Sequence, residues 1–311
     1  MAAWPRAGSV PLTYRAAMDG IVIVDKPAGM TSHDVVARVR RLARTRRVGH
    51  GGTLDPMATG VLVVGVGRAT RLLTYVIGTD KGYAATIRLG QRTVTDDAEG
   101  EVVATRSADA VTDEAIRAGL AALTGEIDQV PSAVSAIKVG GRRAYHRVRE
   151  GEQVALAPRR VRISRLDVRA IRRELPGLVD VEVDLACSSG TYVRAVARDL
   201  GETLGVGGHL TALRRTFVGG FTLAEAIPLA ELEQRAPDVV SLSLAEAARR
   251  AFADHREVDA GQARALSHGR PLPAVGVTGP YPVFAPTGEL VAVVAERGGA
   301  ARPEAVFAPA G

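Results

Sequence analysis

Residues 179–205 read VDVEVDLACSSGTYVRAVARDLGETLG, and their pattern indicates the fold class. Apolar residues alternate with acidic ones from Val179 onward, which is typical of a strand with one buried and one wet face. Such a strand favours an antiparallel or mixed sheet over a buried parallel one. After a short loop, a helical stripe begins at Val193 and ends before Gly205, with Thr191 as the expected N-cap. The stretch therefore predicts an α/β protein.

Further strands and helices are expected on both sides of this stretch. Buried or amphipathic strands are indicated at residues 20–24, 61–66 and 82–89, and a helix at residues 69–77. Past about Arg256 the chain is rich in Pro, Gly and Val, which is typical of a small β domain. Other helices are expected to start at residues that commonly act as N-caps, namely Thr31 with Asp34, Thr112, Thr222 with Glu225, and Ser243 with Glu246.

The charge distribution favours a polyanionic partner. The chain carries 40 Lys and Arg against 34 Asp and Glu, a net charge of +6. Six arginines and no acid lie in residues 38–47, and a second excess of basic residues runs from Lys138 to Glu174. Either run alone is as consistent with a solvated face, but cations that neutralise phosphates gain affinity by releasing counterions. Two separate basic runs therefore favour nucleic acid as the partner.

Lysine is rare among the basic residues. Only Lys26, Lys81 and Lys138 are lysines, and arginine supplies all the others. A lysine retained in such a chain suggests a need for a compact ammonium in place of a planar guanidinium. The preference for arginine also suggests a bacterium with a GC-rich genome.

Several common functional classes are excluded by the absence of their motifs. The sequence has no P-loop, no complete dinucleotide fingerprint and no nucleophile elbow. One cysteine, Cys187, and six histidines give no metal-ligand spacing. No run of residues reads as a membrane span or a secretion signal, so we expect a cytoplasmic protein that does not bind a membrane. We expect any chemistry to need no metal and no cofactor.

One carboxylate stands in an unusually glycine-rich loop, GHGGTLDPMATG, residues 49–60. Asp55 precedes Pro56, which biases the aspartate toward extended backbone. The four glycines tolerate positive φ and leave room for the close approach of a ligand. On its own the loop is better explained by an ordinary Asx turn. The other motifs of the sequence decide between an Asx turn and a loop that presents Asp55 to a ligand.

Five motifs occur in the order and spacing of one known family. They are GIVIVDKPAGMTS, VGHGGTLDPMATGVL, TDKGYAATIRLGQRT, SGTYVRAVARDLG and GHLTALRRT, spread over about residues 20–230. In these motifs the chain resembles the TruB family of tRNA pseudouridine synthases. The resemblance implies isomerisation of the T-loop uridine of tRNA, which is a redox-neutral reaction. It also implies a pseudouridine-synthase fold, with a mixed, largely antiparallel sheet flanked by helices.

The resemblance also implies roles for individual residues. Asp55 matches the family's nucleophile, Arg194 the arginine that pairs with it, and Tyr83 the tyrosine that stacks on the target base. Their plainer interpretations are a turn residue, a solvated arginine and a core tyrosine. Whether Asp55 attacks the ribose or the uracil ring stays open. Further substrate-binding positions implied by the motifs are His50, Tyr192, Leu213, Asp97 and Lys26, together with Lys138, Arg142 and Arg143 of a basic segment.

The resemblance finally implies a domain order and a partner. Residues 1–18 match nothing and are expected to be mobile. Residues 19–253 would form the catalytic domain, with a basic T-loop-binding insertion at about 125–155, and residues 254–311 a small PUA-like RNA-binding domain. We expect a monomer that binds the T stem-loop of tRNA and flips the uridine out of its stack. The alternatives are a non-catalytic RNA-binding module or tRNA-folding chaperone, and a guide-RNA-dependent pseudouridine synthase.

Overall fold

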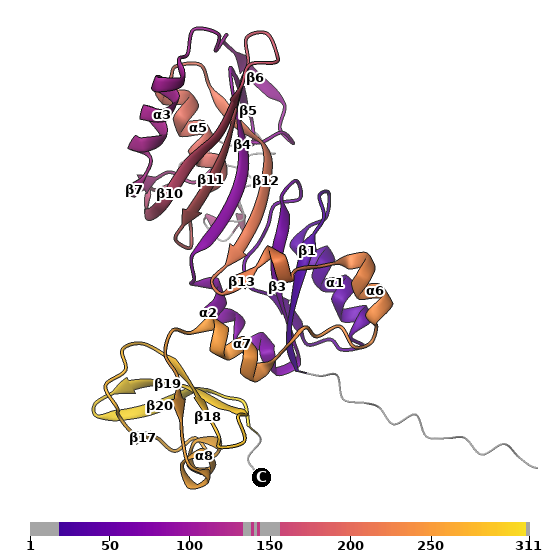
Figure 1. Ribbon diagram of the computed structural model, residues 1–311, viewed down its shortest axis with the longest axis vertical. Helices are drawn as coiled ribbons and strands as arrows, with labels where there is room; N and C mark the ends of the chain where they lie inside the picture. The colour runs from indigo at the N-terminus through magenta and orange to yellow at the C-terminus, as the bar shows by residue number, and fades with distance from the viewer. Residues whose placement is uncertain (1–18, 133–137, 140–141, 144–155, 309–311) are drawn as a thin grey trace, which may run out of the picture.

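The computed structural model shows a large mixed sheet and a smaller C-terminal sheet (Figure 1). The extension expected at residues 1–18 and most of the basic insertion lie outside the described residues. Within the described ranges, every helix is too short or too polar to traverse a lipid bilayer. The structure describes residues 19–132, 138–139, 142–143 and 156–308, with the backbone alone at 138–139 and 142–143.

The large sheet confirms the fold class that the alternating strand predicts. Its main strands are β1 (Gly20–Lys26), β3 (Thr59–Val66), β4 (Lys81–Leu89), β7 (Gly125–Gln129), β10 (Arg159–Arg172), β11 (Val179–Cys187), β12 (Gly208–Val218) and β14 (Ile227–Pro228). They lie in the order β14-β1-β3-β12-β4-β11-β10-β7. Along this path the contacts of β1 with β14 and of β3 with β12 are parallel, and the others are antiparallel. Every second side chain of β11 is buried, as its sequence predicts.

Shorter strands complete this part of the molecule. Three of them join the margins of the large sheet, and the others form two separate hairpins. The strands at the margins are β2 (Val48–His50), β13 (Phe221–Thr222) and β15 (Leu242–Ser243). The hairpins pair β5 (Gln91–Thr93) with β6 (Val102–Thr105), and β8 (Lys138–Val139) with β9 (Arg142–Arg143).

The helices that pack on the large sheet include α1 (Ser32–Leu42), α3 (Asp113–Ala122) and α5 (Val193–Thr203). Thr31 and Thr112 cap the first two through their side chains, which confirms the sequence prediction. The predicted cap of α5 is wrong, because its N-cap is Tyr192. The Thr191 hydroxyl instead donates to the carbonyl oxygen of Ser188 at 2.9 Å, within the preceding turn.

Two other helix predictions need correction. Residues 69–77 do not form one helix but contribute to η1 (Gly67–Arg71) and α2 (Leu73–Ile77), because the backbone closes a tighter turn between Leu72 N and Ala69 O, 2.9 Å apart. Thr222 precedes only a three-residue turn, η2 (Leu223–Glu225), without a side-chain cap. Ser243 and Glu246 do form the predicted capping box. The later helices are α6 (Leu229–Arg235) and α7 (Leu244–Ala251).

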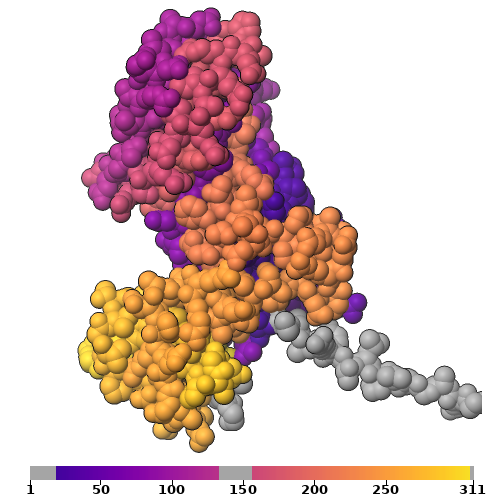
Figure 2. Space-filling view, in the orientation of Figure 1, coloured from indigo at the N-terminus to yellow at the C-terminus, as the bar shows by residue number. Residues whose placement is uncertain are grey.

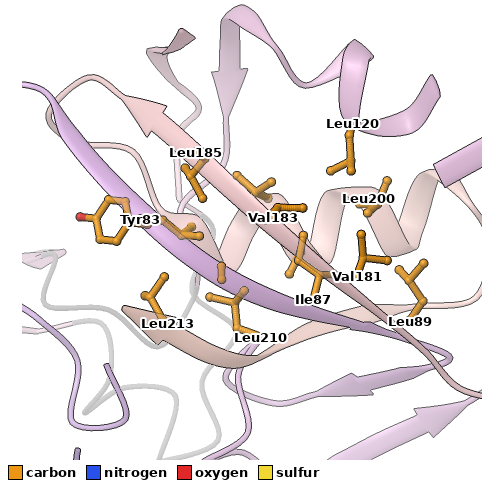
Figure 3. Close-up of a cluster of buried hydrophobic side chains, with 14 of the residues drawn as sticks. Tyr83, Ile87, Leu89, Leu120, Val181, Val183, Leu185, Leu200, Leu210 and Leu213 are labelled. Carbon is orange, nitrogen blue, oxygen red and sulfur yellow. The ribbon is translucent and has the colours of Figure 1, made fainter. Parts of the chain in front are cut away.

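The largest core lies between the sheet and helices α3 and α5 (Figure 3). Tyr83, Ile87 and Leu89 share one buried face of β4, as the strand pattern predicts. β11 and β12 pair with β4 on its two sides and extend this face. Tyr83 and Leu213 stand at one end of the cluster, and the phenol oxygen of Tyr83 points away from the other labelled side chains (Figure 3). The end of the core can therefore also serve as the wall of a pocket.

The C-terminal region is built around a five-stranded sheet, which confirms the β character expected past Arg256. Its strands are β16 (Arg256–Glu257), β17 (Leu272–Pro273), β18 (Tyr281–Phe284), β19 (Leu290–Arg297) and β20 (Ala300–Val306), beside helix α8 (Ala260–Ser267). They lie in the order β16-β18-β19-β20-β17. Whether this region is a PUA-like RNA-binding domain stays a prediction.

The C-terminal sheet packs directly on η1, α2 and α7 (Figures 1 and 2). Phe284 and Phe307 are buried in one apolar cluster with Leu73 of α2. Arg71 Nη1 donates to the carbonyl oxygen of Val306 at 2.6 Å, next to the end of β20. Tyr75 of α2 donates from its hydroxyl to Glu304 Oε2 of β20 at 3.3 Å, so helix α2 is held on one side by the last strand of the described residues.

Candidate active site

A pocket of about 270 Å³ opens where β4, β12 and the start of α5 meet the loop between β2 and β3. This placement matters because the large core ends at the same point, so apolar side chains form one wall and polar loops the other. The lining comes from residues 52–55 of the loop, Ile77 at the end of α2, Lys81 and Tyr83 of β4, residues 189–194, and Leu213 and Arg215 of β12.

The loop that carries Asp55 is held by α1 and by its own backbone. Ser32 Oγ, which is buried, accepts from Leu54 N at 2.8 Å and lies 3.1 Å from Leu54 O. Gly51 N donates to Val63 O at 2.8 Å, and Ala58 N to Asp55 O at 3.1 Å. Both interpretations of the loop therefore hold: its backbone forms a turn, and this turn presents Asp55 to the pocket.

Lys26 lies beneath this loop and does not line the pocket. Its side chain is fully buried at the end of β1. The ammonium Nζ donates to the carbonyl oxygens of Pro27 at 2.8 Å, Pro56 at 3.1 Å and Ala58 at 2.6 Å. Burial lowers the pKa of Lys26, and the nearby Asp55 carboxylate opposes that shift. Lys26 therefore holds the backbone just after Asp55 against the end of β1, and its predicted substrate contact stays a prediction.

Arg194 pairs with Asp55 across the pocket. It is the second residue of α5, and its side chain is only 7% exposed, whereas that of Asp55 is 37% exposed. Arg194 Nε lies 3.0 Å from Asp55 Oδ2. Its Nη1 donates to Thr95 O at 2.9 Å and lies 3.5 Å from Asp97 Oδ2. The solvated-arginine interpretation is wrong, because these partners hold the guanidinium in place beside the carboxylate.

Asp97 supports Arg194 from behind and does not line the pocket. It is 2% exposed and also accepts hydrogen bonds from the Thr95 hydroxyl and from Glu99 N. The turn between β5 and β6 thus supplies both a carbonyl and a carboxylate to the guanidinium. Asp97 is placed to orient Arg194, and its predicted substrate contact stays a prediction.

Tyr83, Leu213 and Tyr192 come together on the apolar side of the pocket. Tyr83 and Leu213 are each 8% exposed, on the neighbouring strands β4 and β12. Burial raises the pKa of Tyr83, so the neutral phenol is favoured. Tyr192 is half-buried, and the buried Gln129 side chain holds its backbone by accepting from Tyr192 N at 2.8 Å and donating to Tyr192 O at 3.1 Å.

Four predicted residues remain, and of these the structure describes only the side chain of His50, which is not among the described residues that line the pocket. His50 lies on β2, and its ring makes a T-shaped contact with that of His33, with the centroids 5.4 Å apart. Burial lowers the pKa of His50, which favours the neutral ring. Lys138, Arg142 and Arg143 lie in the hairpin β8–β9, whose side chains are outside the described part of the structure. Their RNA contacts stay predictions.

Two cations of the pocket, Lys81 and Arg215, are not among the site residues that the sequence predicts. Lys81 is 8% exposed, and its Nζ donates to Ile77 O at 2.9 Å and to Thr79 O at 2.7 Å. Burial, and then the charge of Arg215, lower the pKa of Lys81 to about 8. The scarcity of lysine was a signal for Lys81, because it and Lys26 both aim a compact ammonium at several carbonyls. Arg215 lies within a quoted motif, but nothing in the pattern distinguishes it from Arg214.

The charges of the pocket suit an anionic ligand and a nucleophile. Three cations line it, Lys81, Arg194 and Arg215, against the single carboxylate of Asp55. The apolar wall can hold a flat base, and Asp55 is the one lining side chain of the described residues that can act as a charged oxygen nucleophile. Among the described residues, no group of His, Cys, Asp and Glu is arranged to hold a metal ion.

Comparison with solved structures and family models defines the class of the protein. A chain from the crystal structure of a Cbf5-Nop10-Gar1 complex superposes with a TM-score of 0.72 and 25% identity, covering 95% of this chain and 87% of that one. A chain from an H/ACA RNP bound to a substrate RNA containing 2'-deoxyuridine gives a TM-score of 0.71 at 24% identity, with 94% and 86% covered, and shares the fold. Residues 40–193 match the model described as TruB family pseudouridylate synthase, N-terminal domain. The fold and the sequence together define a pseudouridylate synthase.

Relatives in curated collections narrow this class to one family. Proteins named tRNA pseudouridine synthase B are 60% identical in Arthrobacter sp. (strain FB24), over 94% of this chain and 97% of that protein, and 57% identical in Thermobifida fusca, over 93% and 99%. Residues 194–240 match the tRNA pseudouridylate synthase B C-terminal domain, and residues 254–308 match tRNA pseudouridine synthase II, C terminal. The chain belongs to the TruB family, which confirms the resemblance seen in the motifs.

Proposed function

We propose that this protein isomerises the T-loop uridine of tRNA to pseudouridine, with Asp55 as the nucleophile. The observation that carries the proposal is the pair of Asp55 and Arg194, 3.0 Å apart in a pocket walled by Tyr83 and Leu213. The relatives named tRNA pseudouridine synthase B support tRNA as the substrate. A non-catalytic RNA-binding module would have no need for a carboxylate held by a buried arginine.

The reaction conserves every atom of the substrate. The bond between N1 and the ribose C1′ breaks, a bond between C5 and C1′ forms, C5 loses a proton and N1 gains one. Because a stacked base shields these atoms, the uridine must first be flipped into the pocket. Asp55 then attacks the flipped nucleotide, at the ribose or at the uracil ring, and is released when the new bond has formed. Arg194, whose Nε lies 3.0 Å from Asp55 Oδ2, orients the carboxylate for this attack.

The proposal extends to the rest of the chain. Residues 19–253 would act as the catalytic domain and residues 254–311 as a small RNA-binding domain. The arginine-rich run and the basic insertion would hold tRNA phosphates. We also propose that the protein acts as a monomer and without a guide RNA. A tRNA substrate also supports the cytoplasm as the compartment.

The proposal is tested with an unmodified tRNA transcript and Asp55→Asn. Purified wild-type protein, without guide RNA or added metal, should form pseudouridine at the T-loop position. Asp55→Asn should bind the tRNA as tightly as the wild type and form no product, because the amide is not a nucleophile. Asp113→Asn is a matched control, since Asp113 pairs with Arg173 at 2.7 Å outside the pocket. Absence of product from the wild type, or comparable turnover by Asp55→Asn, would reject the proposal.

A further inference from the structure

Arg215 occupies an unusual position for an arginine. It lies on β12 directly opposite Tyr83 of the antiparallel neighbour β4, so the two side chains share one face of the sheet. Arg215 is only 1% exposed, although it contributes to the lining of the pocket. Its neighbour Arg214 reaches the opposite side, where Nη2 lies 2.7 Å from Asp25 Oδ2. Arg215 is thus a cation buried between the sheet and the loop of Asp55.

Three hydrogen bonds connect the Arg215 guanidinium to that loop. Its Nε donates to Val61 O at 2.7 Å, Nη2 to Gly52 O at 3.0 Å and Nη1 to Thr53 O at 3.3 Å. Gly52 and Thr53 precede Asp55 and Val61 follows it, so one rigid group holds both ends of the loop. The backbone also approaches closely, since a Cβ built on Gly60 would lie 2.2 Å from Arg215 O.

Stability alone does not explain a buried guanidinium, because its burial costs free energy. The cost of removing a charge from water is large, and well-packed apolar side chains often stabilise a protein as much as a buried ion does. Arg194 and Arg214 pair with the carboxylates of Asp55 and Asp25, whereas the Arg215 guanidinium donates to the backbone carbonyls of the Asp55 loop. We therefore expect the role of Arg215 to lie in the pocket that it lines.

Arg215 also reaches Tyr83. The two residues lie opposite each other on neighbouring strands, and while burial raises the pKa of the Tyr83 phenol, the charge and side chain of Arg215 lower it. The phenol oxygen lies at the end of the core cluster and points away from it (Figure 3). One guanidinium thus contacts the predicted base-stacking residue and the loop that carries the predicted nucleophile.

We propose that Arg215 is a positioning residue for the isomerisation, fixing the Tyr83 ring and the Asp55 loop relative to each other across the pocket. The inference rests on the proposed function. The flipped uridine must present its ribose or ring carbon to Asp55 while its base lies against Tyr83, and a shift of about 1 Å between reacting groups can cost about 100-fold in rate. Arg215 acts through these two residues and takes no chemical step itself.

The test compares Arg215→Lys and Arg215→Met with matched variants of Arg88. Arg88 lies on β4 and pairs through two hydrogen bonds with Asp180, at 2.7 and 2.8 Å, outside the pocket. Thermal melting, tRNA binding and the single-turnover rate at saturating enzyme are measured for each. Arg215→Lys is expected to keep the tRNA dissociation constant within about threefold and to lose about 100-fold in single-turnover rate. Arg88→Lys and Arg88→Met are expected to change the rate by less than about threefold.

A double-mutant cycle with Tyr83→Phe separates positioning from a general loss of structure. If Arg215 acts through Tyr83, the double variant Tyr83→Phe/Arg215→Lys should be at most about threefold slower than the slower single variant. Three outcomes would each overturn the inference. They are a double variant whose loss in rate equals the product of the two single losses, an unchanged rate for Arg215→Lys, and a loss confined to tRNA affinity. Should the Arg215 variants not fold, an undiminished single-turnover rate for Tyr83→Phe would overturn it, and a large loss would support it. A wild type that forms no pseudouridine rejects the proposed function, whereas an active wild type with an equally active Arg215→Lys rejects this inference alone.

Discussion

Replacing Lys26 by methionine should destabilise the protein and slow it, because the ammonium beneath the Asp55 loop has three partners and no contact with water. Its Nζ donates to three carbonyl oxygens at 2.6 to 3.1 Å, and the side chain is 0% exposed. Methionine has nearly the same length, so the change removes the charge and the donors while leaving most of the volume in place.

The expected loss of stability follows from two opposing effects. Hydrogen bonds from a charged donor contribute about 1.5 to 3 kcal/mol each, so three of them exceed 4 kcal/mol in total. Methionine avoids the cost of burying an ammonium, a cost that also lowers the pKa of Lys26. We expect a net loss of about 3 kcal/mol in the free energy of unfolding, and a fall in Tm of about 5 °C for a protein of this size. Lys26→Arg should also be destabilising, since a planar guanidinium does not fit a site shaped for an ammonium.

Urea unfolding and calorimetry measure the change, with Arg117→Met as the control. Arg117 is an exposed cation on α3, and its replacement should alter the free energy of unfolding by less than about 0.5 kcal/mol. At 25 °C, where both variants remain folded, the single-turnover rate of Lys26→Met should fall because two of the lost hydrogen bonds hold Pro56 and Ala58, just after Asp55. A loss of stability below about 1 kcal/mol would refute the reasoning that the three carbonyls depend on this ammonium.

Three further predictions concern the same region. Gly60→Ala should cost about 3 kcal/mol in urea unfolding, because φ is +96° and the new Cβ would lie 2.2 Å from Arg215 O; a neutral result would contradict this geometry. Lys81 has its folded pKa lowered to about 8 from 10.5, so between these pH values the unfolded state binds more protons and the stability of the wild type should rise with pH relative to Lys81→Met, by at most about 1.4 kcal/mol per pH unit. A pH-independent difference in the unfolding free energies would oppose that shift. Gln129→Leu leaves the backbone N–H and carbonyl of Tyr192 without their side-chain partner and should raise KM for tRNA and cost about 2 kcal/mol of stability, whereas unchanged kinetics would show that Tyr192 is fixed by other contacts.

The sequence predicted the local parts of the fold well because their causes are local. The capping box of Thr31 and Asp34 needs only residues three apart, and both of its hydrogen bonds form. The alternation after Val179 likewise specifies a strand with one buried face wherever its partners lie. The cap expected at Thr191 failed because a turn closed by Ser188 uses its hydroxyl, and no periodicity reports such a turn.

The site depended on information that local patterns do not contain. Asp55 on its own reads as a turn residue, and only the family motifs predicted that Arg194 lies beside it. The burial of Arg194 follows from partners in a distant hairpin, Thr95 and Asp97, so its charge alone predicted a solvated face. Arg215 was indistinguishable from Arg214 because the pleat of β12 decides which of two adjacent arginines enters the protein.

The contact between helix α2 and the C-terminal sheet has a consequence for the order in which the site is completed during synthesis. Ile77, the last residue of α2, lies on the rim of the pocket, and its carbonyl accepts from Lys81 Nζ and from Ser189 Oγ. The same short helix is braced by β20, which begins at Ala300, far along the chain from Arg215, the last described residue that lines the pocket. A ribosome must therefore translate the chain through β20 before this rim gains its outer support, and a nascent chain that already carries the described pocket residues still lacks that support.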